Sequence, residues 1–193
     1  MPTTYTAFGG EQRIASGALP EVALAIKRAA RRGVAEPVLI FEDQTGRQTD
    51  FDLRGNEDDI RARYETASAA DAASSEPPRK RGRPKLGVVA REVTLLPRHW
   101  DWLNTQPGGA SVALRKLVDA ARQANAGKDR QRRASEAAYR VMTALAGNMP
   151  GYEDATRALF AGDQEGLAAK MRAWPADIRD YALSCAFPNT NED

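Results

Sequence analysis

A stretch in the middle of the chain limits what the 193 residues can fold into. Ala72–Pro78 reads AASSEPP, and Pro78–Lys85 continues as PRKRGRPK. Small polar residues, prolines and like charges cannot bury enough apolar surface to offset the loss of chain entropy on folding. We therefore predict a disordered linker over residues 71–90. Any folded core has to be built from the segments on either side of it.

The sparse Cys and His content excludes several classes of protein. Cys185 and His99 are the sole residues of their types, so the chain alone can form neither a disulfide nor a Cys/His zinc site. No stretch approaches the roughly 18 apolar residues of a membrane span, and the start lacks the pattern of a signal peptide. The spacing of the residues indicates no catalytic constellation. We expect a cytoplasmic protein that is not an enzyme and has no cofactor or metal.

The net charge of +2 conceals a strong asymmetry along the chain. Residues 1–78 sum to −4, residues 79–140 to +10 and residues 141–193 to −4. A basic segment between acidic flanks indicates a nucleic-acid partner for the middle of the chain. A solvated basic face without a partner is the alternative.

The segment before the linker, residues 1–70, is predicted to be a small α/β unit. Gly9-Gly10 suggests a hairpin turn, and Pro20 and Gly33 suggest the start and stop of a helix. The expected elements are strands Thr3–Phe8 and Gln12–Ser16, helix Leu19–Arg32, strands Pro37–Glu42 and Arg47–Leu53, and a closing helix Asn56–Ala70. The pattern is ββαββ followed by a helix, and the fold class is α+β.

The end of the chain, residues 127–187, is predicted to be helical. A long helix is expected from Lys128 to Gly147, and three shorter ones at about 151–161, 163–173 and 175–186. Apolar residues at helical spacing would form the core of a small bundle. The net charge of −4 over residues 141–193 favours dimer support or a protein partner over DNA contact. Residues 188–193 are expected to be a disordered tail.

The basic run resembles the AT-hook, a short peptide that binds the DNA minor groove through Arg81, Gly82, Arg83 and Pro84. Glycine lets the backbone approach the groove floor, and proline keeps the chain extended. Narrow A/T-rich grooves attract the arginines. The neighbouring cations would contact phosphates: Arg79, Lys80 and Lys85. A basic targeting signal and an RNA-binding arm are the competing interpretations.

Residues 91–126 have the element order of a ribbon-helix-helix protein. A strand Arg91–Leu96 precedes a helix Pro97–Gln106, and Ser111 is the expected N-cap of a second helix that ends near Asn125. The segment resembles that family, in which two chains pair their strands into a ribbon that enters the major groove. The resemblance implies a homodimer. It also implies phosphate contacts at Gly109, Ala110, Ser111 and Lys116.

Either of two alternating sets of side chains on the expected strand 91–96 could face the bases. One frame turns Glu92, Thr94 and Leu96 toward the groove, and the other turns Arg91, Val93 and Leu95. Arg91 and Thr94 are the candidate base-reading residues.

Over nearly its full length the chain also resembles a bacterial family known only as a domain of unknown function. Two runs carry that resemblance, GRPKLGVVAREVTLLPRHWDWL at 82–103 and AGNMPGYEDATRALFAGD at 146–163. The resemblance implies a bacterial setting and no particular activity.

These observations favour a dimeric protein that binds double-stranded DNA, preferably A/T-rich, in the bacterial nucleoid. It would act as a transcriptional regulator or an architectural protein. Two alternatives remain: a protein-interaction adaptor, such as an antitoxin-like subunit with secondary DNA contact, and an RNA-binding protein. In either case the C-terminal helices could bind a protein partner.

Overall fold

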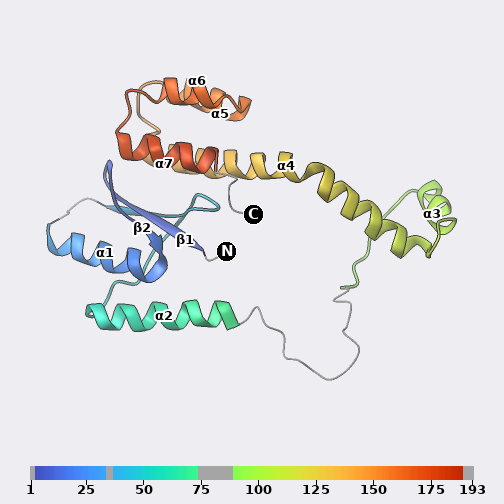
Figure 1. The fold of residues 1–193 in the computed structure, drawn as a ribbon, viewed down its shortest axis with the longest axis horizontal. Coiled ribbons are helices and arrows are strands. Elements are labelled where there is room, and N and C mark those ends of the chain that lie inside the picture. Colours follow the sequence, from blue (N-terminus) through green and yellow to red (C-terminus); the bar gives the residue numbers. More distant parts are fainter. Residues whose placement is uncertain (1–2, 34–36, 74–88, 189–193) are drawn as a thin grey trace. The chain divides into compact units, whose positions relative to one another are not determined.

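The computed structural model describes residues 3–33, 37–73 and 89–188, and of residues 66–73 the backbone alone. The chain divides into two compact units. The first unit contains Met1–Glu76 and Arg130–Asp193, and the second unit contains Pro77–Asp129. The strands and helices confirm the predicted α+β class (Figure 1). No helix in the described part of the chain is long and apolar enough to cross a membrane.

The first unit contains a four-stranded antiparallel sheet with the strand order β2-β1-β3-β4. The strands are β1 (Thr4–Gly9), β2 (Gln12–Ala18), β3 (Val38–Glu42) and β4 (Arg47–Thr49). Thr6 lies opposite Ser16 of β2 and Phe41 of β3. Because side chains alternate along a strand, Thr6 and Phe8 point to one face of the sheet and Ala7 to the other. Both faces are buried.

Helix α1 (Leu19–Arg31) covers the face to which Ala7 points. Pro20 fits the first turn, where its missing N–H costs nothing, and the Glu21 carboxylate accepts a hydrogen bond from the backbone N–H of Ala18 at 3.3 Å. The buried side of α1 consists of apolar residues at helical spacing: Val22, Ala23, Leu24 and Ile26. Two of these, Val22 and Ile26, pack with Ala7 and Ile40 of the sheet.

Helix α2 (Glu57–Ala73) packs against α1 on the side away from the sheet. Ile60 is fully buried there. The Glu57 carboxylate accepts hydrogen bonds from Arg28 at 2.8 Å and Arg31 at 3.2 Å. The hydrogen bond from Arg28 and its positive charge lower the pKa of Glu57. These contacts tie the start of α2 to the last turns of α1.

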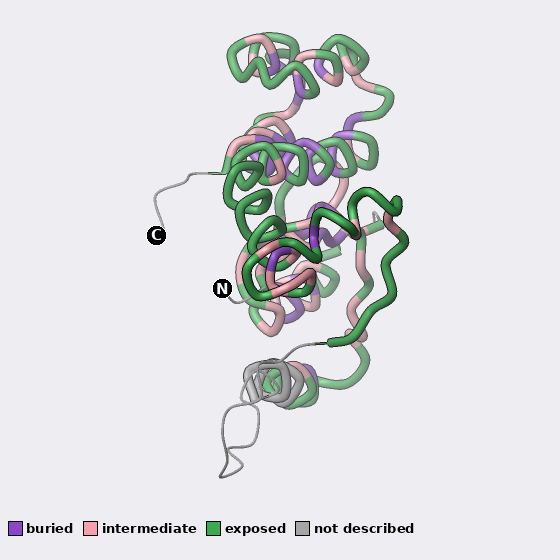
Figure 2. Tube along the Cα trace, turned by 90° about the vertical axis from the view of Figure 1, so that its right-hand side faces the viewer, coloured by how far each residue is buried: buried purple, intermediate pink, exposed green. Residues whose placement is uncertain are grey.

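The opposite face of the sheet is covered by the end of α4 (Gly109–Ala146) and by α7 (Ala176–Ala186). Helices α5 (Tyr152–Ala161) and α6 (Gln164–Lys170) pack on the side of α4 and α7 that faces away from the sheet (Figure 1). Phe8 and Phe41 are fully buried in the same core as these helices. Buried and exposed residues alternate along the helices in Figure 2, as expected where one side of a helix is packed and the other faces solvent. The fully buried large side chains from the helices are Val141, Met142, Leu159, Leu167, Met171 and Ile178.

The turn between β3 and β4 lies directly against α4. Gly46 has φ +63°, and a Cβ at this position would overlap the backbone of Ala137. Arg140 donates a hydrogen bond to the carbonyl oxygen of Thr45 at 2.6 Å. A residue with a side chain therefore cannot replace Gly46 without moving the turn or the helix.

The N-terminal segment and the C-terminal helices are far apart in the sequence, but they share one core. Phe8 and Phe41 are fully buried because the C-terminal helices cover the face of the sheet to which these side chains point. The strand expected to reach Leu53 ends at Thr49, and Phe51 and Leu53 pack, partly buried, beside α1 and Ile60.

The second unit contains α3 (Pro97–Asn104) and the first part of α4. Residues 91–96, the expected strand, have no regular secondary structure, since no other strand lies in the described part of this unit to pair with them. The expected break between helices near residues 125–128 is also wrong, because α4 runs unbroken through Gly127. One glycine costs a helix only about 1 kcal/mol, and the neighbouring Ala, Gln, Arg and Lys residues are good helix formers.

Replacing Phe8 by Ala should destabilise the first unit by about 3–5 kcal/mol, because it removes a fully buried ring and leaves a cavity. Phe160→Ala is the matched control, since the Phe160 side chain is 57% exposed, and it should cost less than about 1 kcal/mol. Urea unfolding followed by circular dichroism measures both values. Equal losses would contradict the packing described here.

Candidate nucleic-acid interface

A tight turn joins the two helices of the second unit. The backbone N–H of Gly109 donates to the carbonyl oxygen of Gln106 at 2.9 Å, and Gly108 and Gly109 have φ values of +86° and +76°. A Cβ at Gly108 would lie 3.1 Å from the side chain of Val112. The two glycines therefore allow α4 to begin immediately after the turn.

The residues expected to bind phosphate lie together at the start of α4. Gly109, Ala110 and Ser111 form its first turn, and Lys116 is exposed further along the helix. Ser111 is inside the helix and is not its N-cap, because α4 starts two residues earlier than expected. The carbonyl oxygen of Ser111 accepts a hydrogen bond from Arg115 at 3.2 Å. First-turn amides have no carbonyl partner within their own helix, so this end of α4 can bind an anion.

The other expected DNA contacts are not brought together by the structure. Arg91 and Thr94 are exposed, in the segment without regular secondary structure. The residues of the AT-hook-like run lie outside the described residues: Arg79, Lys80, Arg81, Gly82, Arg83, Pro84 and Lys85.

Much apolar surface of the second unit is exposed. Among residues 89–129 only Leu103 and Ala113 are buried. Trp102 of α3 is 52% exposed in the single chain. Further exposed apolar side chains come from the segment before α3 and from α4: Val89, Val93, Leu96, Leu117 and Val118. Two buried side chains are too few to hold a folded unit, so this surface needs further cover.

Helix α4 has a cationic stripe and an apolar stripe, and the exposed Val118 lies beside the cationic one. Arg115 and Arg122 are seven residues, or about two turns, apart and so lie on one side of the helix. Leu114, Leu117 and Ala121 repeat at i, i+3 and i+7 on the other side. Arg115 and Arg122 were not among the residues expected to contact phosphate. Their spacing of seven residues, which places them on one side of a helix, is nevertheless visible in the sequence.

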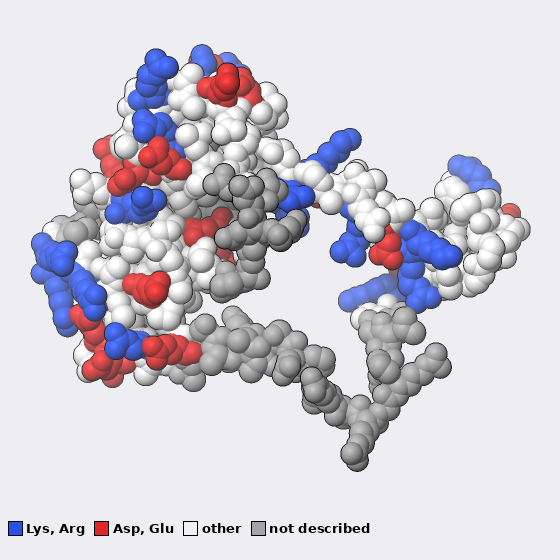
Figure 3. Space-filling view, in the orientation of Figure 1, with Lys and Arg blue, Asp and Glu red and all other residues white. Residues whose placement is uncertain are grey.

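The division into units sharpens the charge asymmetry. The second unit has eleven Lys and Arg against four Asp and Glu, a net charge of +7, whereas the first unit has a net charge of −5. Figure 3 shows basic side chains gathered along the first part of α4, with few acidic ones between them. Arg122 has an acidic neighbour, Asp119, at 3.8 Å, and both are exposed. A screened surface pair of this kind leaves most of the arginine's charge available to a phosphate.

The described residues offer no site for a metal ion, since no three His, Cys, Asp or Glu side chains among them gather closely enough to hold one. The candidate interface consists of backbone amides, cations and apolar side chains.

Comparison with known proteins gives a family for the chain. Residues 4–186, from β1 to the end of α7, match the model of a family described as "Uncharacterized protein conserved in bacteria (DUF2239)". No curated protein and no solved structure matches the chain. The match covers segments of both units and confirms the resemblance to a bacterial domain of unknown function. The chain belongs to the DUF2239 family of bacterial proteins.

Proposed function

We propose that this protein is a dimeric DNA-binding protein, acting as a transcriptional regulator or an architectural protein and not as an enzyme. One observation carries the proposal: the second unit combines a net charge of +7 with a helix pair whose apolar side chains are exposed. Positive charge supplies affinity for the phosphates of DNA. Exposed apolar surface of this extent needs a protein partner.

A second copy of the chain is the partner that fits best. It would provide an antiparallel strand for residues 91–96 and would cover Trp102, Leu117 and Val118 at the same time. Full burial of one Val or Leu side chain contributes about 1.5–3 kcal/mol. Several such residues on each copy would offset the entropy that association costs. The paired strands would then form the ribbon of the ribbon-helix-helix proteins, with Arg91 or Thr94 toward the bases.

Phosphate contacts would come from the start of α4 and its cationic side. The backbone N–H groups of Ala110 and Ser111 would bind one phosphate, since that of Gly109 already donates to Gln106. Lys116 and Arg122 would bind its neighbours. Dimerisation doubles these contacts, and each neutralised phosphate steepens the dependence of affinity on salt.

The AT-hook-like run would add a minor-groove contact next to this module. Seven residues separate Pro84 from Arg91 and span at most about 24 Å. At about 3.4 Å per base pair, Arg81 and Arg83 would reach the groove within roughly seven base pairs of the ribbon. The short tether gives the arm a high effective concentration there.

Replacing Arg81 and Arg83 together by Ala should weaken binding to an A/T-rich duplex by about tenfold and bring it close to the G/C-rich value, because the minor-groove contact is lost. Lys116→Ala should weaken both duplexes alike and make the log-log salt slope shallower by about 1.8, because each of the two copies loses one phosphate contact. Fluorescence anisotropy at two salt concentrations measures these effects.

The matched control removes the same charge from the first unit through Arg47→Ala and Arg172→Ala, two exposed arginines that should leave affinity unchanged. Absence of binding to either duplex at low salt would overturn the proposal. Preference for single-stranded RNA over duplex would favour the RNA-binding alternative. A stoichiometric protein partner that blocks DNA binding would favour the adaptor.

Leu117→Glu should convert the dimer into a monomer, because it places a carboxylate within the apolar side of α4. Gln123→Glu introduces a carboxylate at an exposed position of the same helix, outside the stripe formed by Leu114, Leu117 and Ala121, and should leave the dimer intact. Sedimentation equilibrium at micromolar concentrations measures both. A monomeric wild-type protein, or a dimer that survives Leu117→Glu, would contradict the proposed interface.

A further inference from the structure

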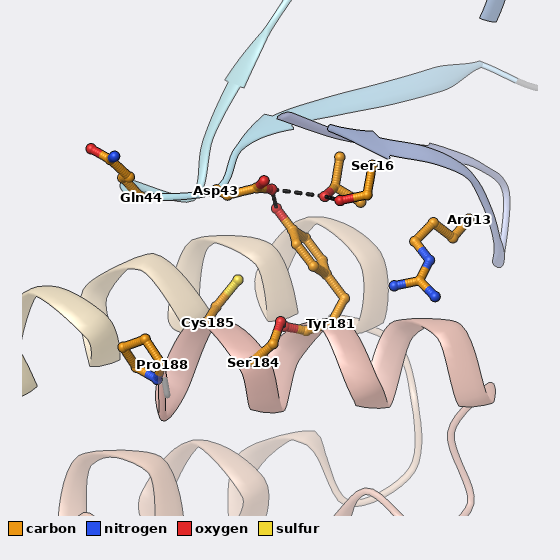
Figure 4. Close-up of a pocket in the computed structure, with 9 residues that line it drawn as sticks. Arg13, Ser16, Asp43, Gln44, Tyr181, Ser184, Cys185 and Pro188 are labelled. Atoms are coloured by element: carbon orange, nitrogen blue, oxygen red, sulfur yellow. Dashed lines mark hydrogen bonds between the residues drawn. The ribbon is translucent and has the colours of Figure 1, made fainter. Parts of the chain in front are cut away.

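A polar hollow lies between the sheet and α7 in the first unit (Figure 4). Its volume is about 310 Å³. Its walls come from β1, β2, the turn after β3, and the end of α7: Thr6, Arg13, Ser16, Asp43, Gln44, Tyr181, Ser184, Cys185 and Pro188. The backbone N–H of Arg13 donates to the Asp177 carboxylate of α7 at 2.8 Å, so opposite walls are joined to one another.

The Asp43 carboxylate is held in place at one end of the hollow. One of its oxygens, Oδ1, accepts hydrogen bonds from the Thr6 hydroxyl at 2.7 Å and the Tyr181 hydroxyl at 2.9 Å. No Lys or Arg among the described residues forms an ion pair with Asp43, and Oδ2 has no hydrogen-bond partner there. A fixed carboxylate without a counter-charge is suited to bind an ammonium group.

Arg13 supplies the opposite charge. Its side chain forms no ion pair with a described residue, and in Figure 4 it points into the hollow. The Asp43 carboxylate meets the hydroxyl end of Tyr181, whereas the Arg13 guanidinium lies toward the other end of that side chain (Figure 4). The two charges are therefore separated along the length of the tyrosine.

The remaining ionisable groups of the hollow stay neutral. Burial, and then the charge of Asp43, raise the pKa of the Cys185 thiol to about 12. Burial also raises the pKa of Tyr181, and nearby Asp43 adds to this effect. Neither group ionises near neutral pH, so a ligand meets one anion, one cation and the neutral side chains of Tyr181 and Cys185.

We infer that this hollow binds an extended zwitterion, with an ammonium group on Asp43, a carboxylate on Arg13 and a spacer along Tyr181. A free amino acid with a terminal amine and a short peptide both carry this chemistry. The inference is independent of DNA binding, because every residue it uses belongs to the first unit.

Three probes of similar length test the inference on the full chain: 6-aminohexanoate, hexylamine and hexanoate. The zwitterion should bind at least about tenfold more tightly than either molecule with a single charge, because it alone makes both contacts. Calorimetry gives the affinities, and amide chemical shifts should change near residues 13, 43 and 181. Tighter binding of triglycine would also support the inference and would identify a peptide as the source.

Two variants assign the contacts. Arg13→Gln should reduce the affinity for 6-aminohexanoate to that for hexylamine, and its exposed side chain leaves the fold unaffected. Asp43→Asn keeps an oxygen that accepts from Thr6 and Tyr181 but should remove the gain from the ammonium group. The controls Arg47→Gln and Asp50→Asn make the same charge changes at exposed positions outside the hollow. Equal binding of zwitterion and hexanoate, no binding at millimolar concentration, or no effect of Arg13→Gln would overturn the inference.

Discussion

The first unit depends on the burial of one face of its sheet by helices from the other end of the chain. The rings of Phe8 and Phe41 lie 5.4 Å and 6.1 Å from the ring of Tyr181, measured between centroids. Aromatic contacts of this kind add stability beyond the area that they bury. The same interface contains the hydrogen bond from Tyr181 to Asp43, and none of the described residues has a buried side-chain nitrogen or oxygen without a partner. The interface is apolar at its centre, and the hollow beside Tyr181 lies at its edge, where polar side chains replace the apolar ones.

The second unit has the opposite character. It lacks a comparable core, and its apolar side chains and its cations are both exposed on α3 and α4. A unit with so few buried side chains gains stability from any partner that binds its folded form, whereas the first unit is stabilised by its own packing. The net charges of +7 and −5 are consistent with the proposed DNA contact through the second unit, because DNA repels acidic surface.

Local chemistry explains much of the fold, and long-range contacts explain what the sequence could not predict. Gly10, Pro20 and the spacing of Val22 and Ile26 are enough to place a hairpin and α1. No local pattern relates Asp43 to Tyr181, which are 138 residues apart, so the polar hollow was not predicted. The helix break expected near Gly127 failed because one glycine is a weak stop signal. A strand at 91–96 would need a pairing partner, and the described residues of the second unit contain no other strand.

The two-part construction of the first unit has a consequence for synthesis on the ribosome. Residues 1–76 are completed first, but the helices that cover Phe8 and Phe41 belong to the last third of the chain. At about 5–20 residues per second, the remainder of the chain takes about 6–23 s to synthesise. During this interval one face of the sheet lacks its cover and is open to chaperones or to aggregation. The entire second unit is made within the same interval, so its exposed apolar side chains leave the ribosome before the first unit has finished folding.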